Sequence, residues 1–523
     1  MDGQINWAEP PESRSDIVLV PDQLLPQNHI VRLLDEVLDQ QDWSEWESLY
    51  LRARGQPPRH PRVLAKIILY GLMLGLRSSR RIEYCLQHHI DFIWLASGQS
   101  FDHSTICQFR TRHQKGLKAL FLGVCKTAMT LGLARIGDIA FDGTRTRANN
   151  NRYNSRTAES LQRRLARLDE QFQAALDQAA EVDAHDADRF DQQTAPTELP
   201  EELADLESRR EKLTAALAEI EAIDAQRKQN GLAPTQLPMA DHDARIMPNK
   251  EGGFAPNYTP TATTEGQGGF ILDCNVLNEV NEGQEVVESI DRIEEHFGEP
   301  DRVLADKGMN DGPAIDAMEQ RGIDYYTPVE SEEMTPDHPA YREDFTQPVR
   351  ESEREKLSTR AGQLDKKCFA YDEQQDCYYC PMGERMEPCG QRRERNGKST
   401  STIYQPVASG CCAGCPLKDR CLGGTKQNDR TISRNEHAEC RERMSQKMAT
   451  PEAKAIFNQR SRIAEQPFGT LKGTMGIRQF LLRGLAKVRQ EWRWYCTSLN
   501  LRNLLSGIAR LRAEGTLPQP EGS

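Results

Sequence analysis

The fold is decided by the stretch Ile136-Gly137-Asp138-Ile139-Ala140-Phe141-Asp142-Gly143-Thr144. Its short apolar run ends in Asp-Gly-Thr, which is typical of a buried strand that opens into a turn. A second apolar run, Arg302-Val303-Leu304-Ala305-Asp306, also ends in an aspartate. Helical patterns at Gln284–Phe297 and Asp311–Arg321 flank this second run, and another apolar run follows at Ile323–Val329. Strands that alternate with helices predict a mixed α/β core.

Asp142 and Asp306 therefore share one position, at the carboxyl end of a predicted strand. Ligands and reacting groups collect at that edge of an α/β sheet. Carboxylate oxygens suit Mg²⁺ or Mn²⁺, and a pair of such ions can stabilise both the attacking and the leaving oxygen of a phosphodiester displacement. Taken singly, either aspartate would more often be an ordinary turn residue. The two together predict a metal site that needs a third carboxylate.

Glu465 is the candidate for that third carboxylate. If its segment is helical, Lys472 lies two turns further along the same face and Arg462 one turn before Glu465. Cations beside a metal-binding carboxylate suit a phosphate backbone. Pro467 either kinks this helix or begins a new one. Glu491 is a rival, but its aromatic neighbours indicate a helix packed against the core.

Three motifs in this order resemble the DDE transposases of bacterial insertion sequences: Asp142-Gly143-Thr144, Ala305-Asp306-Lys307-Gly308, and Glu465-Gln466-Pro467-Phe468-Gly469-Thr470-Leu471-Lys472. The group that is most similar is the one numbered eleven eighty-two, whose members carry an amino-terminal helical region of the InsH type. The likeness spans about Asp22 to Arg510. It implies a ribonuclease-H-like core in which Asp142, Asp306 and Glu465 form a catalytic triad that binds Mg²⁺ or Mn²⁺.

A related transposase signature places Tyr, Arg, Glu and Lys on the final helix. Glu465 and Lys472 meet its spacing, whereas Asn458 stands at the Tyr position and Ser461 at the Arg position. Arg462 comes one residue late for the arginine. Lys472 and Arg462 are therefore the expected contacts to the DNA backbone.

The resemblance implies an enzyme that cleaves DNA at the ends of an insertion sequence and joins the freed 3′ hydroxyl to target DNA. Its partners would be double-stranded terminal inverted repeats and target DNA, held by a homodimer in the synaptic complex. Two alternatives stay open: a DNA-binding transposase remnant without cleavage activity, and a metal-dependent nuclease on the same core. All three acidic positions are filled, which favours an active enzyme.

The amino-terminal region is predicted to be helical from Pro61 to Leu133 because apolar residues recur near a period of 3.6. Ser104 is expected to cap a short basic helix whose Arg110 and Arg112 face outward. These arginines are candidate DNA contacts, and the alternative is an ordinary solvated face.

Fourteen cysteines in the chain cluster mainly between Cys368 and Cys421. Cys377 and Cys380 form one closely spaced pair, and Cys412 and Cys415 form a second pair about thirty residues later. Two such pairs have the spacing of a tetrahedral zinc site. A structural Zn²⁺ would explain how a segment with little apolar periodicity folds, and the alternative is a set of reduced cysteines without metal. Cys411, Cys368 and Cys389 could also compete as ligands. The candidate ligands are Cys377, Cys380, Cys412, Cys415 and Cys421.

The net charge of −12 argues weakly against a nucleic-acid partner, but the charge is unevenly distributed. Residues 56–135 carry about +9 and residues 429–512 about +10, whereas residues 156–227 carry about −9. We expect no membrane span and no secretory signal, and hence a cytoplasmic protein.

These observations predict an α/β protein with a ribonuclease-H-like core, an amino-terminal helical domain and two insertions. The expected divisions are a helical domain at 15–134, a core at 135–330 and 429–512, a helical hairpin at 156–230, a cysteine-rich segment at 331–428 and a polar tail at 513–523.

Overall fold

The structure is a computed structural model that describes residues 20–50, 60–151, 153–187, 201–229, 233–249, 252–279, 282–393, 399–424 and 427–517. The predicted segments that fall on 15–19, 188–200 and 518–523 lie outside the described residues.

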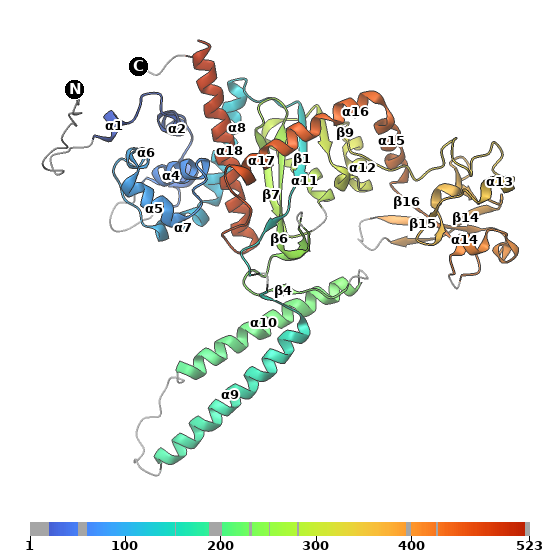
Figure 1. The fold of residues 1–523 in the computed structure, drawn as a ribbon, viewed down its shortest axis with the longest axis horizontal. Helices are drawn as coiled ribbons and strands as arrows, with labels where there is room; N and C mark the ends of the chain where they lie inside the picture. The colour runs from blue at the N-terminus through green and yellow to red at the C-terminus, as the bar shows by residue number, and fades with distance from the viewer. Residues whose placement is uncertain are drawn as a thin grey trace, which may run out of the picture.

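A mixed sheet lies at the centre of the molecule (Figure 1), and the prediction of an α/β protein is confirmed. Its main strands lie in the order β7-β6-β1-β8-β9, with β6 antiparallel to its neighbours and β1, β8 and β9 parallel. β2 and β5 pair with the first half of β6. The strands are β1 (Asp138–Gly143), β2 (Thr146–Arg147), β5 (Arg245–Pro248), β6 (Phe254–Glu265), β7 (Ile271–Leu277), β8 (Arg302–Ala305) and β9 (Asp324–Tyr326).

Helices cover both faces of this sheet because alternate residues of β1 and β8 are apolar on either side. Phe141 and Ala305 pack against α11 and α12, whereas Ala140 and Leu304 pack against residues of α16 and the π-helical turn η5. Both faces of these parallel strands are therefore buried. The helices are α11 (Gly283–Phe297), η2 (Lys307–Met309), α12 (Gly312–Gln320), α15 (Ala438–Ala449), α16 (Pro451–Phe457), η5 (Ser461–Glu465), α17 (Gln466–Gly473) and α18 (Leu485–Ala513).

The amino-terminal helices share one hydrophobic core with α18 and with β6 and β7. Trp494 Nε1 donates a hydrogen bond to the Arg110 carbonyl at 3.0 Å, and Ser498 Oγ donates one to the Leu69 carbonyl at 2.9 Å. α18 is therefore the element that joins the amino-terminal helices to the sheet. They are α1 (Pro21–Leu24), α2 (Ile30–Asp39), α3 (Ser44–Glu47), α4 (Pro61–Met73), α5 (Ser79–His88), α6 (Ile90–Leu95), α7 (His103–Arg112) and α8 (Gln114–Thr130).

Two long helices, α9 (Ala158–Ala187) and α10 (Glu201–Gln229), project from the sheet as an antiparallel pair (Figure 1). Ion pairing between Arg210 and Asp169 and a hydrogen bond between Gln162 and Glu221 join them along their length. At their base, β3 (Ser155–Arg156) pairs with β4 (Leu237–Pro238). The chain therefore leaves and re-enters the core at neighbouring points.

The cysteine-rich segment has a hydrophobic core of its own, although its sequence shows little apolar periodicity. β12 to β16 form an antiparallel sheet, and the hydrophobic core beside it includes Phe369, Tyr378 and Met386. β16 extends this sheet past the predicted boundary at residue 428. The elements are α13 (Glu351–Arg354), β10 (Thr359–Arg360), β11 (Gln363–Leu364), η3 (Lys366–Cys368), β12 (Ala370–Asp372), β13 (Cys377–Tyr379), β14 (Arg385–Arg393), β15 (Thr400–Pro406), η4 (Cys411–Gly414), α14 (Lys418–Leu422) and β16 (Ile432–Asn435).

Candidate active site

Asp142 and Asp306 lie on adjacent parallel strands, because Phe141 of β1 pairs with Ala305 of β8. Neighbouring strands are about 4.8 Å apart, and side chains alternate between the faces of a sheet. Both aspartates therefore follow Ala140 and Leu304 toward the face that η5 covers. Asp306 Oδ1 accepts the amide N–H of Gly308 at 2.6 Å, which orients its carboxylate at the start of η2.

Glu465 is the last residue of η5, the π-helical turn that packs over β1 and β8. Ile463 and Ala464 are buried against β1 and β8, which fixes η5 over the strands, while the Glu465 side chain stays 61% exposed. The Arg460 guanidinium lies between two carboxylates, 3.7 Å from Asp142 Oδ2 and 3.9 Å from Glu465 Oε1. One guanidinium contacts both acids, so Asp142 and Glu465 lie on either side of a single side chain.

Arg460 was not predicted as a site residue, and a π-helical turn explains why. Residues 461–465 form this turn, which closes over five residues instead of four. The turn brings Arg460, five residues before Glu465, onto the face of that glutamate. Arg460 also lies 5.9 Å from the ring of Phe457. The aromatic and the arginine of the resembled signature thus have counterparts one residue earlier than Asn458 and Ser461.

Arg462 points away from the carboxylates. It lines a groove with Arg135, Asp138 and Arg302 at the amino ends of β1 and β8, the edge opposite Asp142 and Asp306. The expectation that Arg462 shares a face with Glu465 is therefore wrong. The prediction assumed a regular α-helix, whereas the extra residue in the π-helical turn rotates Arg462 away from Glu465.

Lys472 lies close to the end of β1. Its Nζ donates a hydrogen bond to Thr144 Oγ1, two residues after Asp142. Pro467 begins α17 instead of kinking it, because proline is tolerated in the first turn of a helix. Glu491, the rival third carboxylate, is buried and accepts the backbone N–H groups of Leu481 and Leu482, so it holds a loop.

A buried ion pair that sequence reasoning missed lies behind the aspartates. Glu282 Oε1 is 2.6 Å from Arg145 Nη1, which also donates to Thr259 Oγ1 at 2.8 Å. Burial raises the pKa of Glu282 although Arg145 opposes this effect, and the negative charges of Asp142 and Asp306 raise it further. Glu282 therefore belongs to the electrostatic surroundings of both aspartates. Only the folded chain brings residues 145 and 282 together, so no local sequence signal indicated the pair.

The two arginines predicted on α7 differ in their exposure. Arg110 Nη1 donates to the Arg77 carbonyl at 2.7 Å, and its Nε and Nη2 are buried, so the expectation that it faces outward is wrong. Arg112 is exposed, with its guanidinium 5.5 Å from the Tyr50 ring. The cap of α7 is Asp102, which accepts the amide N–H groups of Ser104 and Thr105, and not Ser104 as predicted.

The predicted zinc ligands fall into two groups. Cys380, Cys412, Cys415 and Cys421 line one cavity. Cys377 is fully buried in a separate apolar cluster with Ala370 and Tyr379, which contradicts its candidacy as a ligand. None of the fourteen cysteines is in a disulfide, and all of them lie within the described residues.

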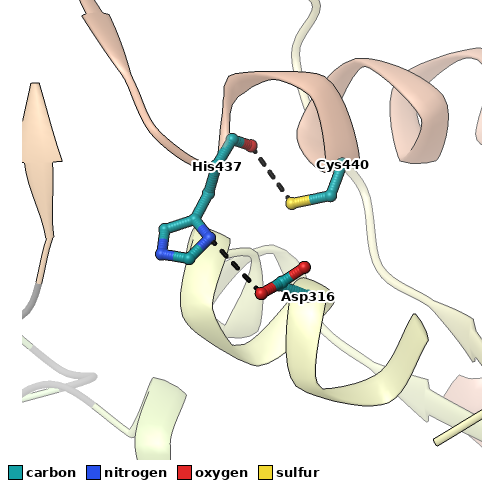
Figure 2. A group of neighbouring side chains, drawn as sticks. All are labelled: Asp316, His437 and Cys440. Atoms are coloured by element: carbon teal, nitrogen blue, oxygen red, sulfur yellow. Dashed lines mark hydrogen bonds and ion pairs between the residues drawn. The ribbon is translucent and has the colours of Figure 1, made fainter. Parts of the chain in front are cut away.

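A third cluster, Asp316, His437 and Cys440, joins α12 to α15 (Figure 2). His437 Nδ1 lies 3.8 Å from Asp316 Oδ2, and Cys440 Sγ donates a hydrogen bond to the His437 carbonyl at 3.1 Å. Burial raises the pKa of Cys440 to about 11, so its thiol is protonated at neutral pH. The three side chains thus lie between α12 and the start of α15.

Two separate segments of the chain match models of known families. Residues 379–505, which contain Glu465, match the family model described as "Transposase DDE domain", and residues 19–112 match the one described as "Transposase domain (DUF772)". Both are transposase domains. Together they support a DDE transposase, a class of DNA-transposition enzyme with a ribonuclease-H-like fold that generally uses Mg²⁺ or Mn²⁺. No curated protein matches the chain.

In the described part of the chain, every helix is too short or too polar to cross a lipid bilayer.

Proposed function

We propose that the protein is a transposase that cleaves DNA at the ends of an insertion sequence and joins those ends to target DNA. The observation that carries the proposal is the placement of two aspartates at the ends of adjacent strands, with a guanidinium that contacts one of them and Glu465. Asp142 and Asp306 end adjacent parallel strands, and Arg460 contacts both Asp142 and Glu465. The matches to two transposase domains support the same conclusion.

The donor set fits hard divalent cations. Asp142, Asp306 and Glu465 offer only carboxylate oxygens, which Mg²⁺ and Mn²⁺ prefer, and no thiol or imidazole is part of this group. These three residues would hold the ions. When bound, such ions activate the attacking oxygen and neutralise charge on the leaving oxygen.

The cations around the acids suit a DNA phosphate. Arg460 Nη1 is buried and has no hydrogen-bond partner among the described residues, so it can donate to a phosphate oxygen at little further desolvation cost. Lys472 lies on the same side, beside Thr144. Arg145 is held by Glu282 and keeps positive charge beneath the aspartates. In this proposal, Arg460 and Lys472 orient the scissile phosphate, and Arg145 with Glu282 positions the end of β1.

Several finer assignments belong to this proposal. The substrate is double-stranded DNA with terminal inverted repeats, bound by a homodimer in the cytoplasm, and the chain is of the group numbered eleven eighty-two with an InsH-type amino-terminal region. Arg112 and Arg462 contact the DNA backbone away from the carboxylates, whereas the buried Arg110 is withdrawn from this role. A structural Zn²⁺ in the cysteine-rich segment takes no part in the reaction.

The test uses the full chain and DNA that carries the ends of its element. Asp142→Asn, Asp306→Asn and Glu465→Gln should each abolish Mg²⁺-dependent cleavage and leave DNA binding nearly intact. Asp316→Asn, which changes a carboxylate between α12 and α15, is the matched control and should cleave normally. Full cleavage by any of the three site variants would remove that residue from the assignment.

The products separate the proposal from its alternatives. A transposase gives strand-transfer products in which the freed 3′ end is joined to target DNA. A nuclease would give cleaved ends without joining, and a transposase remnant would bind the DNA and leave it uncut.

A further inference from the structure

Five cysteines from two separated stretches of the cysteine-rich segment line one cavity: Cys380, Cys411, Cys412, Cys415 and Cys421. Cys380 follows β13, Cys412 and Cys415 belong to or follow η4, and Cys421 lies in α14. Cys380, Cys412, Cys415 and Cys421 therefore line a common space, although no three of their sulfur atoms lie within 4.8 Å of one another.

Two of the four lie in turns of the kind that presents a thiolate to a metal. Cys380 Sγ accepts the amide N–H of Met382 at 3.3 Å, and Cys415 Sγ accepts that of Leu417 at 3.4 Å. In both turns a proline, Pro381 or Pro416, separates donor and acceptor. A backbone N–H aimed at sulfur stabilises its negative charge, which a neutral structural thiol does not need.

Two cations and one carboxylate, that of Glu384, line the same cavity. Arg430 and Lys418 line it, and Arg430 donates hydrogen bonds to Gln363 and to the Leu364 carbonyl, which holds its guanidinium in place. Four thiolates on Zn²⁺ carry a net charge of about −2, so nearby cations lower the cost of burying such a site.

A competing group lies beside this one. Ligand atoms of Cys411, Cys412 and Asp429 are within 4.8 Å of one another. The Asp429 carboxylate, however, accepts the amide N–H groups of Gly410 and Cys412, at 2.7 and 3.3 Å, so it already holds the η4 turn. This group offers three ligands, whereas structural zinc is almost always bound by four.

We propose that Cys380, Cys412, Cys415 and Cys421 bind one structural Zn²⁺ ion that ties the turn after β13 to η4 and α14. Cys377 and Cys411 are not ligands. The ion joins two stretches that are about thirty residues apart in the chain and fixes the cysteine-rich sheet at its edge. This site is independent of the proposed transposition chemistry, because its ligands are all outside the carboxylate group.

The test measures zinc in the purified full chain by mass spectrometry. Wild type should hold about one zinc ion per chain. Cys380→Ser and Cys421→Ser should lose most of it, while the matched controls Cys377→Ser and Cys411→Ser keep it. Zinc-free, folded wild type would overturn the proposal. Loss of zinc in Cys411→Ser with retention in Cys421→Ser would assign the ion to the competing group instead.

Thiol alkylation of the wild-type protein tests the same proposal without variants, some of which could fail to fold. With zinc bound, Cys380, Cys412, Cys415 and Cys421 should resist thiol alkylation, and a chelator should expose all four together. The exposed Cys389 should react at the same rate with and without chelator. An alkylation rate of the four thiols that is the same with and without chelator would contradict the proposal.

Discussion

Gly143 follows Asp142 and has no room for a side chain, so Gly143→Ala probes the packing behind the candidate active site. A Cβ atom at this position would lie 1.9 Å from Glu282 Oε2 and 2.6 Å from Glu282 Cδ. The glycine does not have a positive φ, so alanine causes no backbone strain there. The Glu282 carboxylate must therefore move by more than about 1 Å to restore a normal contact distance to the new Cβ atom.

The cost comes from the ion pair that this movement breaks. Glu282 and Arg145 are 2.6 Å apart, with side chains only 9% and 19% exposed. Removing one partner of a buried pair costs about 3–5 kcal/mol, so a displaced partner should cost about 2–4 kcal/mol. In a Glu282→Ala background the space is free, and Gly143→Ala should then cost less than about 1 kcal/mol. Glu282→Gln keeps the volume and should keep the clash.

Hydrogen exchange at the amides of β1 and β6 measures this local free energy, since a chain with several cores does not unfold in a single transition. The double-mutant cycle should give a coupling of about 2–3 kcal/mol between positions 143 and 282. Equal costs of Gly143→Ala in the wild-type and Glu282→Ala backgrounds would refute the packing described here.

Three further predictions concern other parts of the molecule. Arg460→Ala should reduce DNA cleavage about 100- to 1000-fold, whereas Arg462→Ala should reduce it less than about tenfold, and the reverse order in a cleavage assay would reject the role given to Arg460. Burial lowers the pKa of His113 to about 4, so the amino-terminal helices should lose about 2 kcal/mol between pH 7.5 and pH 5, as the unfolded chain takes up the proton first. Thermal unfolding of His113→Gln should lack this part of the pH dependence, and an unchanged dependence would argue against it. Replacement of residues 158–235 by a short Gly/Ser linker should leave exchange protection in β1 and β6 intact, because β3 and β4 already pair at the base of the helices; lost protection would mean that the hairpin supports the core.

Much of the sheet could be predicted because buried parallel strands are continuous apolar runs. Ile139, Ala140 and Phe141 are fully buried, and the strand that they form ends at Asp142 and Gly143 as the sequence indicates. The predicted helix from Gln284 begins one residue earlier in the structure. The positions of Asp142 and Asp306 at one edge follow from these strands and from their parallel pairing.

The longest strand of the sheet, β6, was not predicted because its buried side chains are polar and it contains two prolines. Thr259, Thr261 and Thr263 are at most 1% exposed, and polar residues normally indicate a surface. Their hydroxyls are satisfied by partners from other elements, as Thr263 Oγ1 bonds to Ser289 Oγ at 2.6 Å. Such partners exist only in the folded chain, so periodicity alone cannot reveal this strand.

The sequence analysis named the three acids and Lys472 as candidate site residues and missed Arg460. Glu465 and Lys472 could be located from a motif. The position of Arg460 beside Glu465 depends on a π-helical turn, which the sequence pattern does not predict. Cys377 forms a two-residue spacing with Cys380 that favours a zinc knuckle, yet its position in β13 buries it in another cluster. In both cases local spacing misleads because backbone geometry changes which residues share a face.

The central claim is that Asp142, Asp306 and Glu465 bind shared divalent ions. Electron paramagnetic resonance of Mn²⁺ bound to the full chain, in complex with DNA that carries the element's end, tests it most directly. Asp142→Asn, Asp306→Asn and Glu465→Gln should each weaken Mn²⁺ binding at least about tenfold, because each removes a charged oxygen ligand, while Asp316→Asn should bind as wild type does. Mn²⁺ affinity that is unchanged in all three site variants would contradict the claim.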